Sequence, residues 1–293
     1  MTCAVCGTKE PYTILYPECI QQDKVSFVAR KTPNKIHFRI VRCNNCGLTY
    51  SNPIYPVEQI VQLYRKSEFI HEPQIENMRR DYKNQLQKVI PLLKEWQSLL
   101  EIGCASGFFL KSAIELGFKE VRGVEPGENA VKHADPDIRP KIINTVFSEE
   151  LFEPETFDVV CFFQVFDHIT DPNAFLQDVY KVLRKDGLIL AINHDIRSLM
   201  PRGMGERSPM FDIEHIYLFD KKTMKMILEK NGFEVVSVLN IANSYTIEYC
   251  LKMFPMPTFI KKHLLMISNK VGVADKIINI SAGNMLAIAR KSQ

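Results

Sequence analysis

The sequence predicts an α/β protein with a doubly wound, mostly parallel sheet, preceded by a small β domain held together by a metal. Two observations carry this prediction. From residue 98 onward, apolar segments typical of buried strands alternate with segments of helical periodicity, the pattern of a parallel sheet covered on both faces. Within the first fifty residues, two C-x-x-C-G motifs begin at Cys3 and Cys43.

The composition is that of an ordinary globular protein and excludes several classes. The 293 residues are 46% hydrophobic with a formal net charge of +3, too small to indicate a nucleic-acid partner. The sequence has no run of eighteen apolar residues that would predict a membrane span, and its first residues do not resemble a signal peptide. Eight cysteines in such a chain favour reduced, partly metal-bound thiols and a cytoplasmic location.

The two cysteine motifs predict a zinc ribbon over residues 1–52. Each motif directs two thiolates to one point, and four thiolates complete the closed tetrahedral shell of a structural zinc ion; the ligands are Cys3, Cys6, Cys43 and Cys46. About fifty residues bury too little apolar surface to fold alone, so a metal is expected. Two unrelated thiol pairs or a redox C-x-x-C remain the alternatives. Strands are expected at 12–16, 25–30 and 35–42.

A helical linker or cap is expected over residues 53–97, after the break at residues 52–56. Apolar positions spaced for one helix face predict helices at 57–69 and 75–96. The following segment, residues 98–293, forms the main domain.

The main domain begins with a strand, a glycine loop and a helix. Residues 99–102 are a short apolar strand, and Gly103 and Gly107 bracket a tight turn in which a Cβ would collide with a ligand. Glu125 ends the next strand, where a carboxylate can accept hydrogen bonds from both hydroxyls of a ribose. Ala105 stands where the dinucleotide fingerprint has its middle glycine, so a nucleoside without phosphates is favoured over NAD.

This stretch resembles the first motif of the class I S-adenosylmethionine (SAM) methyltransferases, E/D-x-G-x-x-x-G, with Glu125 as the acid of the second motif. The resemblance implies a seven-stranded Rossmann-like sheet and SAM as the cofactor. It implies that Phe147 flanks the adenine and that Gln164 faces the methionine portion. The implied cofactor-binding residues are Glu101, Gly103, Ala105, Gly107, Glu125, Phe147 and Gln164.

The remaining elements continue the alternation. Strands are expected near 141–146, 157–163, 188–193, 233–239 and 284–290, and helices at 129–133, 171–183 and 223–230. A helical insertion is expected at about 244–281. Its apolar, basic segment 254–266 is interpreted as a lid or a dimer contact, with a membrane-surface helix as the alternative.

A second resemblance concerns zinc-ribbon methyltransferases that act on a carbon of nucleotide-linked deoxysugars. They share the four cysteines, a histidine after the fourth strand, here His168, and the pair Glu214–His215. They carry a tyrosine where Asp212 stands. They also have a large C-terminal domain where about fifty residues follow the expected sixth strand of this chain.

These observations predict methyl transfer from SAM to a small-molecule acceptor, with a nucleotide-linked sugar or another cell-surface glycan precursor as candidates. Removing a proton from a hydroxyl or carbon acid requires a base. The candidates are His215, oriented by Glu214, then His168, with His194 at the end of the fifth strand as a further one. The alternatives are a non-catalytic protein whose ribbon recruits a partner and an NAD-dependent oxidoreductase. The sequence leaves the acceptor, the methylated atom and the oligomeric state open.

Overall fold

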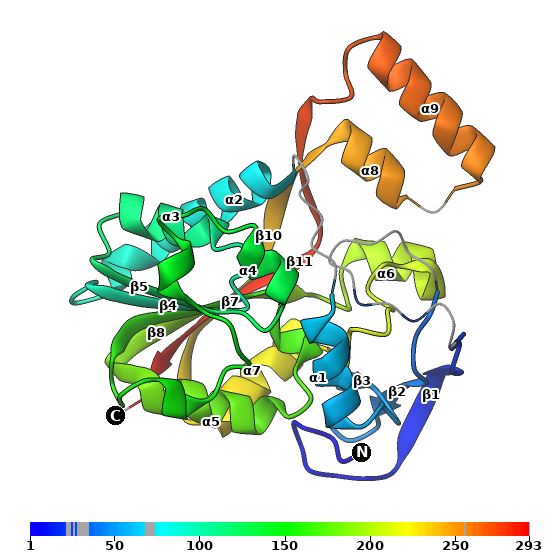
Figure 1. Cartoon of the computed structure of the whole chain (residues 1–293). Coiled ribbons are helices and arrows are strands. Elements are labelled where there is room, and N and C mark those ends of the chain that lie inside the picture. Colours follow the sequence, from blue (N-terminus) through cyan, green and yellow to red (C-terminus); the bar gives the residue numbers. More distant parts are fainter. Residues whose placement is uncertain (22–24, 26, 28–34, 68–73, 255, 293) are drawn as a thin grey trace.

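The larger of two sheets is the centre of the computed structural model, which describes residues 1–21, 25, 27, 35–67, 74–254 and 256–292 (Figure 1). Its strands are β4 (Ser98–Ile102), β5 (Glu120–Val124), β6 (Ile142–Ile143), β7 (Phe157–Phe163), β8 (Leu183–His194), β10 (Phe233–Thr246) and β11 (Ile277–Lys291). Their order is β10-β11-β8-β7-β4-β5-β6. Strands β4 to β8 pair in parallel, and β11 pairs antiparallel with both β8 and β10. The predicted seven-stranded, mostly parallel sheet is confirmed.

Helices cover both faces of this sheet, which is why its central strands are mostly apolar and buried. Every residue of β4 and β7 is buried, as expected for strands enclosed on both faces. One hydrophobic cluster includes residues of α2 (Gln74–Val89) and α3 (Phe108–Glu115), and another includes residues of α5 (Pro172–Val182) and α7 (Lys221–Lys230). Figure 1 shows these two pairs of helices on opposite sides of the strands, with the short α4 (Glu128–Lys132) near the end of β5.

Several elements differ in extent from the prediction. The expected strand at 141–146 is reduced to β6, because a 3-10 turn at Arg139–Lys141 precedes it. The helix expected to reach residue 96 ends at Val89, and a 3-10 turn containing Pro91 follows. Strands β10 and β11 extend beyond the sheet as a two-stranded ribbon, pairing as far as Thr246 with Ile277. The expected insertion consists of α8 (Ile247–Met253) and α9 (Thr258–Lys270) at the end of that ribbon.

The smaller sheet joins the N-terminal segment to a distant part of the chain. It has the order β1-β2-β3-β9, with β1 (Tyr12–Tyr16), β2 (Ile40–Cys43), β3 (Thr49–Ser51) and β9 (Tyr217–Leu218). The strand expected at 35–42 begins only at Ile40, and the one expected at 25–30 lies largely outside the described residues. Because β9 belongs to this sheet, the N-terminal strands are hydrogen-bonded to a segment far beyond residue 52.

The linker also packs onto the main body. Helix α1 (Val57–Arg65) follows the break at residues 52–56, and its buried Ile60 belongs to a hydrophobic cluster that contains residues of both sheets. Of the helices in the described ranges, none combines the length and apolarity needed to cross a bilayer.

Candidate active site

The loop after β4 has a left-handed backbone at three positions. Gly103, Ala105 and Gly107 have φ values of 71°, 50° and 71°, which glycine adopts without strain. A Cβ on Gly103 would lie 2.4 Å from Cγ2 of Val165, and one on Gly107 would lie 2.5 Å from Cγ2 of Ile138. The sharp turn expected of the two glycines is therefore present. The protein's own side chains, in addition, leave no room for a Cβ at either position.

Glu125 links this loop to the loop after β5. Its Oε2 accepts a hydrogen bond from the backbone N–H of Ala105 at 2.9 Å, and its Oε1 accepts one from Gly127 at 2.7 Å. Burial raises the pKa of Glu125, and the two backbone N–H groups oppose that rise. Each carboxylate oxygen has a second lone pair, so both hydroxyls of a ribose could still donate to this group.

Two buried acceptors beside the loop have no hydrogen-bond donor. Glu101 in β4 is 2% exposed, and its Oε2 is unpaired within the described part of the chain, as is the buried Oε1 of Gln164. Gln164 directly follows β7, which pairs with β4. Buried acceptors are normally satisfied. A ligand that brings a donor, such as the ammonium group of SAM, therefore fits these two side chains.

Burial raises the pKa of Glu101 well above its usual range, and the nearby carboxylate of Glu125 adds to that rise. A cation placed against this side chain would favour its charged form. Among the described residues, no cation pairs with Glu101 to favour its ionised form.

Phe147 lies between β6 and α5. Its ring packs edge-on against Phe175, with centroids 5.7 Å apart, and it is half-buried. Its predicted contact with adenine stays a prediction.

Three histidines converge on one buried carboxylate, Asp167. This residue lies in a 3-10 turn, Phe166–His168, directly after β7 and is 1% exposed. His194 donates from Nδ1 to Oδ2 of Asp167 at 2.7 Å. Nε2 of His168 lies 3.6 Å from Oδ1, and Nε2 of His215 lies 3.9 Å from Oδ2. The ring of His215 stands between the other two, with centroid distances of 4.9 Å and 4.8 Å.

The charge of Asp167 depends on these rings. Burial raises the pKa of Asp167, but the positive charge of His168, the hydrogen bond from His194 and the charge of His215 outweigh it. Together they hold the pKa of this carboxyl well below its usual range. Asp167 is thus a fixed negative charge in a water-excluded site, able to stabilise a proton on a neighbouring imidazole.

His215 is oriented by a backbone carbonyl. Its Nδ1 donates to the carbonyl of Met210 at 2.9 Å, so in the neutral ring the lone pair is on Nε2, which faces Asp167. The sequence predicts that Glu214 fixes this tautomer. In the structure the backbone carbonyl of Met210 accepts the hydrogen bond that fixes it. Glu214 is buried in the same segment.

His168 contacts Tyr64 of α1, whose hydroxyl lies 2.6 Å from Nδ1. Burial, reinforced by nearby carboxylates that include Glu214 and Asp167, raises the pKa of Tyr64 well above its usual range. The phenol therefore keeps its proton. Nδ1 of His168 is the nearer acceptor for its hydrogen bond, and the Glu214 carbonyl, at 3.5 Å, is a second one. When the hydroxyl donates to Nδ1, the neutral His168 ring carries its proton on Nε2, on the side of Asp167, which disfavours His168 as the base.

Asp167, His168 and His215 also offer ligand atoms that all lie within 4.8 Å of one another, a spacing that a metal ion could use. Both oxygens of Asp167 accept hydrogen bonds, from His194 and from the amide of Asn193 at 3.2 Å, and each keeps a second lone pair. The cluster therefore offers a network for proton transfer as well as a candidate metal site.

Sequence reasoning missed Asp167, Asn193 and the role of Tyr64. Asp167 directly precedes His168 in an otherwise apolar turn. That position was the only signal that could have pointed to it.

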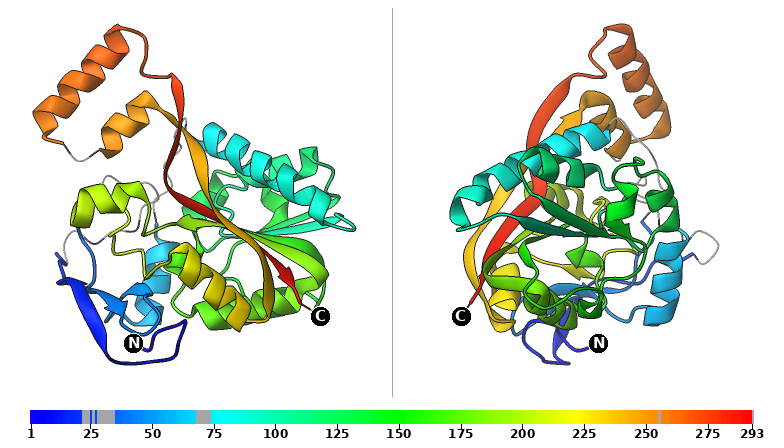
Figure 2. Two further views of the ribbon diagram at one scale, coloured as in Figure 1. Left: turned by 180° about the vertical axis from the view of Figure 1, so that it is seen from behind. Right: turned by 60° about the vertical axis from the view of Figure 1, so that its left-hand side comes forward.

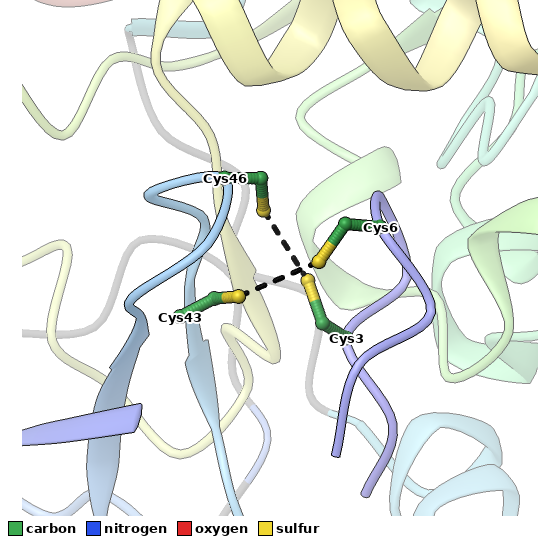
Figure 3. Close-up of side chains that lie close together, drawn as sticks. All are labelled: Cys3, Cys6, Cys43 and Cys46. Atoms are coloured by element: carbon green, nitrogen blue, oxygen red, sulfur yellow. Dashed lines mark hydrogen bonds between the residues drawn. The ribbon is translucent and has the colours of Figure 1, made fainter. Parts of the chain in front are cut away.

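The four predicted metal ligands do come together (Figure 3). Sγ of Cys3 lies 3.4 Å from Sγ of Cys46, Sγ of Cys6 lies 3.5 Å from Sγ of Cys43, and all four lie within 4.8 Å of one another. A tetrahedral zinc ion with bonds of about 2.3 Å needs sulfurs about 3.8 Å apart. The four thiols thus fit a closed zinc site with only small adjustments.

Known proteins place the chain in a family. The family described as "Methyltransferase domain" matches residues 75–238, more than half of the chain. The chain belongs to this methyltransferase family. The matched residues contain the glycine loop, Glu125 and all three histidines of the cluster.

Curated relatives of this methyltransferase-family chain include ubiquinone biosynthesis O-methyltransferases. The human mitochondrial protein is 28% identical over 167 residues, which cover 49% of this chain and 43% of that protein. The one from Rhizobium rhizogenes is 31% identical over 137 residues, which cover 44% and 52%. The chain spans about half the length of the curated relatives it matches.

Solved structures agree on the fold. A chain of the Haloferax volcanii complex between the Trm112 methyltransferase activator and a methyltransferase has a TM-score of 0.52 at 14% identity. The match covers 75% of this chain and 93% of that chain. The α/β methyltransferase fold expected from the sequence is confirmed.

We expect Glu101→Gln to stabilise the cofactor-free protein at about pH 8 and to change little at about pH 4. The folded protein keeps the Glu101 proton to higher pH than the unfolded chain does, because burial raises the folded pKa. The free energy of unfolding therefore falls as the pH rises above about 4.3, the pKa of a glutamate in the unfolded chain. The Glu101→Gln variant does not lose this stability, because glutamine does not titrate. Urea unfolding at both pH values measures the difference. The exposed Glu128→Gln is the control, and a difference for Glu101→Gln that does not vary with pH would contradict the prediction.

Proposed function

We propose that this protein transfers a methyl group from SAM to a small-molecule acceptor whose attacking atom must first lose a proton. The single observation that carries this proposal is the convergence of His168, His194 and His215 on the buried Asp167. The cluster follows the ends of β7 and β8, the edge of a parallel sheet where ligands bind. Family membership supports SAM over NAD as the cofactor.

The loops around β4 supply the cofactor side of the site. SAM, when bound, supplies an electrophilic methyl group on a sulfonium. Glu125 would accept hydrogen bonds from the ribose hydroxyls while its two backbone donors keep it in position. Glu101 and Gln164 would accept from the ammonium group, which satisfies both unpaired oxygens.

The base in this proposal is His215. Its Nε2 carries the lone pair, because Nδ1 is engaged with the Met210 carbonyl. When Nε2 takes the acceptor's proton, the new positive charge faces the carboxylate of Asp167, which lowers the energy of the charged ring. General bases of this kind contribute about 10²–10⁴-fold to rate.

His194 is the second candidate for the base. Its Nδ1–H donates a hydrogen bond to Asp167 at 2.7 Å, so in the neutral ring Nε2 carries the lone pair. This is the carboxylate–imidazole arrangement of a catalytic dyad. Removing each ring separately distinguishes the two.

The names of the relatives support a hydroxyl acceptor. They are O-methyltransferases of ubiquinone biosynthesis, so we propose oxygen as the methylated atom and a small organic molecule as the acceptor. A nucleotide-linked sugar is the second candidate, favoured by the four cysteines together with His168, Glu214 and His215.

We also propose that the four cysteines hold a structural zinc ion. A shell closed by four thiolates leaves no position for water or substrate. Its effect on the site would be indirect, through the smaller sheet. Strand β3 pairs with β9, Ser51 N–H donates to the Ile216 carbonyl at 2.8 Å, and the Ser51 hydroxyl donates to the His215 carbonyl at 3.1 Å.

We expect Glu125→Ala to weaken SAM binding by about one to two orders of magnitude, since hydrogen bonds to a charged group contribute about 1.5–3 kcal/mol each. Titration calorimetry measures the dissociation constant, with the exposed Glu128→Ala as the matched control. Thermal unfolding of both variants checks that the loop remains folded. An unchanged dissociation constant would exclude Glu125 as the ribose ligand.

We expect His215→Gln to lower kcat by about 10²–10⁴ with little change in SAM affinity, because it removes the proton acceptor and leaves the cofactor loops intact. His194→Gln and His168→Gln should cost less. The exposed His263→Gln is the control. A larger loss in His194→Gln than in His215→Gln would transfer the role of base to His194, and near-full kcat in both would overturn the proposal.

Chelation of the zinc should unfold the N-terminal sheet and loosen the segment that carries His215, while the larger sheet persists. Zinc-site binding energy is folding energy for the strands it holds, and β3 is paired with β9. Hydrogen exchange before and after chelation should show loss of protection at residues 40–51 and 214–218, with SAM still bound. Protection retained at 214–218 after residues 40–51 have unfolded would contradict this coupling.

A further inference from the structure

The helical hairpin formed by α8 and α9 projects from the body of the molecule. The views of Figures 1 and 2 agree that it lies beyond the end of the sheet, at the tip of the β10–β11 ribbon. We call residues 254 and 256–271 the hairpin tip; they comprise the described part of the α8–α9 connection, α9 and Val271.

Large apolar side chains on the hairpin tip are exposed to solvent. Phe259, Met266 and Val271 are 68%, 58% and 62% exposed. The further exposed apolar residues of the tip are Phe254, Ile260, Leu264 and Ile267. Positions 260, 264, 267 and 271 follow the spacing of one helix face. Ser268, the buried residue of α9, borders this face, and the more exposed Phe259 and Met266 lie on the side of the helix opposite Ser268.

The charges beside this apolar face are of one sign. Lys261, Lys262 and Lys270 lie on α9, which contains no acidic residue. In the described part of the chain neither Lys262 nor Lys270 has an ion-pair partner. Apolar side chains flanked by unpaired lysines are the combination by which a helix lies in the interface of an anionic bilayer.

A second copy of the chain fits this face less well. An isologous contact would place the same patch on both sides. The three lysines of α9 in one copy would then lie close to the three lysines of α9 in the other copy. Neither α9 helix has a carboxylate to compensate these charges. An anionic surface offsets the same charges directly.

The ribbon that carries the hairpin is firmly attached to the body. Asp81 of α2 accepts hydrogen bonds from the backbone N–H and the hydroxyl of Ser244, at 2.6 Å and 2.7 Å. In the sheet, Asn284 of β11 pairs with both Ile241 and His194. The hairpin therefore leaves the sheet at the same edge at which β8 ends in His194.

We propose that the hairpin tip docks on the surface of an anionic lipid bilayer, with its apolar side chains in the interface and its lysines against the head groups. Docking in this orientation brings the edge of the sheet that carries the histidine cluster to the membrane side. In that position the site would have access to an amphiphilic acceptor held at the bilayer, and this consequence rests on the proposed function. The docking itself does not rest on the proposed function.

The test is co-sedimentation of the full chain with vesicles of phosphatidylcholine alone and of phosphatidylcholine with phosphatidylglycerol. We expect binding to the anionic vesicles that weakens as salt is raised. Lys262→Gln with Lys270→Gln should weaken partitioning by about fivefold for each lysine removed. Phe259→Ser with Val271→Ser should weaken it at least as much, because both side chains would lie in the interface.

Matched controls separate the hairpin from general surface effects. Ile14→Ser changes an apolar residue of β1 that is also exposed, and Lys185→Gln removes an exposed lysine from the opposite edge of the sheet. Both should bind vesicles as the unmodified protein does. SAM binding measured on every variant distinguishes failure of this proposal from failure of the proposed function, because docking requires no cofactor.

Three outcomes would overturn the proposal. The first is no binding of the unmodified protein to anionic vesicles. The second is binding that the hairpin variants do not weaken. The third is a different contact made by the hairpin tip. One form of it would be a dimer, seen in sedimentation equilibrium, that Phe259→Ser with Val271→Ser dissociates. The other would be a lid, seen as amide protection of residues 259–271 when SAM is added without vesicles.

Discussion

The buried negative charge of Asp167 is the constraint on which the architecture of the site depends. A carboxylate that is 1% exposed must be compensated by its neighbours, and here the compensation comes from three separate segments. His168 follows β7, His194 ends β8, and His215 precedes β9. The backbone carbonyl of Asp167 also accepts the N–H of Ile216 at 2.8 Å. One residue thus fixes the relative positions of the chain segments that carry the imidazoles.

The N-terminal sheet is the outer support of this arrangement. It reaches the histidine cluster by the pairing of β3 with β9 and by the hydrogen bonds of Ser51. Tyr64 of α1 adds a second connection, through His168. The N-terminal segment, which the sequence predicts to be a separate domain, is therefore hydrogen-bonded to the segment that carries His215. This explains in physical terms how a metal far from the reacting atoms could still affect their geometry.

The elements that the sequence predicted well are those with strong local patterns. The run Phe157–Phe163 is apolar except for Asp158 and forms β7, and Asp171 caps α5 by accepting hydrogen bonds from the N–H groups of residues 173 and 174. The convergence of the four cysteines was also predictable, because each C-x-x-C turn fixes two sulfurs locally. Glu101, Glu125 and the glycines were located by motif spacing. The sharp turn at the glycines was predictable too, but the side chains that crowd them were not, because Val165 and Ile138 reach them only through the tertiary fold.

The features that could not be predicted depend on contacts between residues that are far apart in the sequence. Strand β9 has two residues, too few for any periodicity, and it exists only because β3 lies beside it. Asp167 has one histidine next to it in sequence, while the other two are 27 and 48 positions away. Asp167 and Glu101 also differ in how far the described part of the chain satisfies their carboxylates. Both oxygens of Asp167 accept hydrogen bonds, whereas Oε2 of Glu101 has no donor, and buried oxygens of Gln164 and Asn193 also lack one. Unpaired buried acceptors destabilise a fold, so the presence of two of them beside the glycine loop is best explained by a ligand that supplies the missing donors. By this argument the carboxylate of Asp167 is held in place before any ligand binds, and the loop side of the site is completed only by binding.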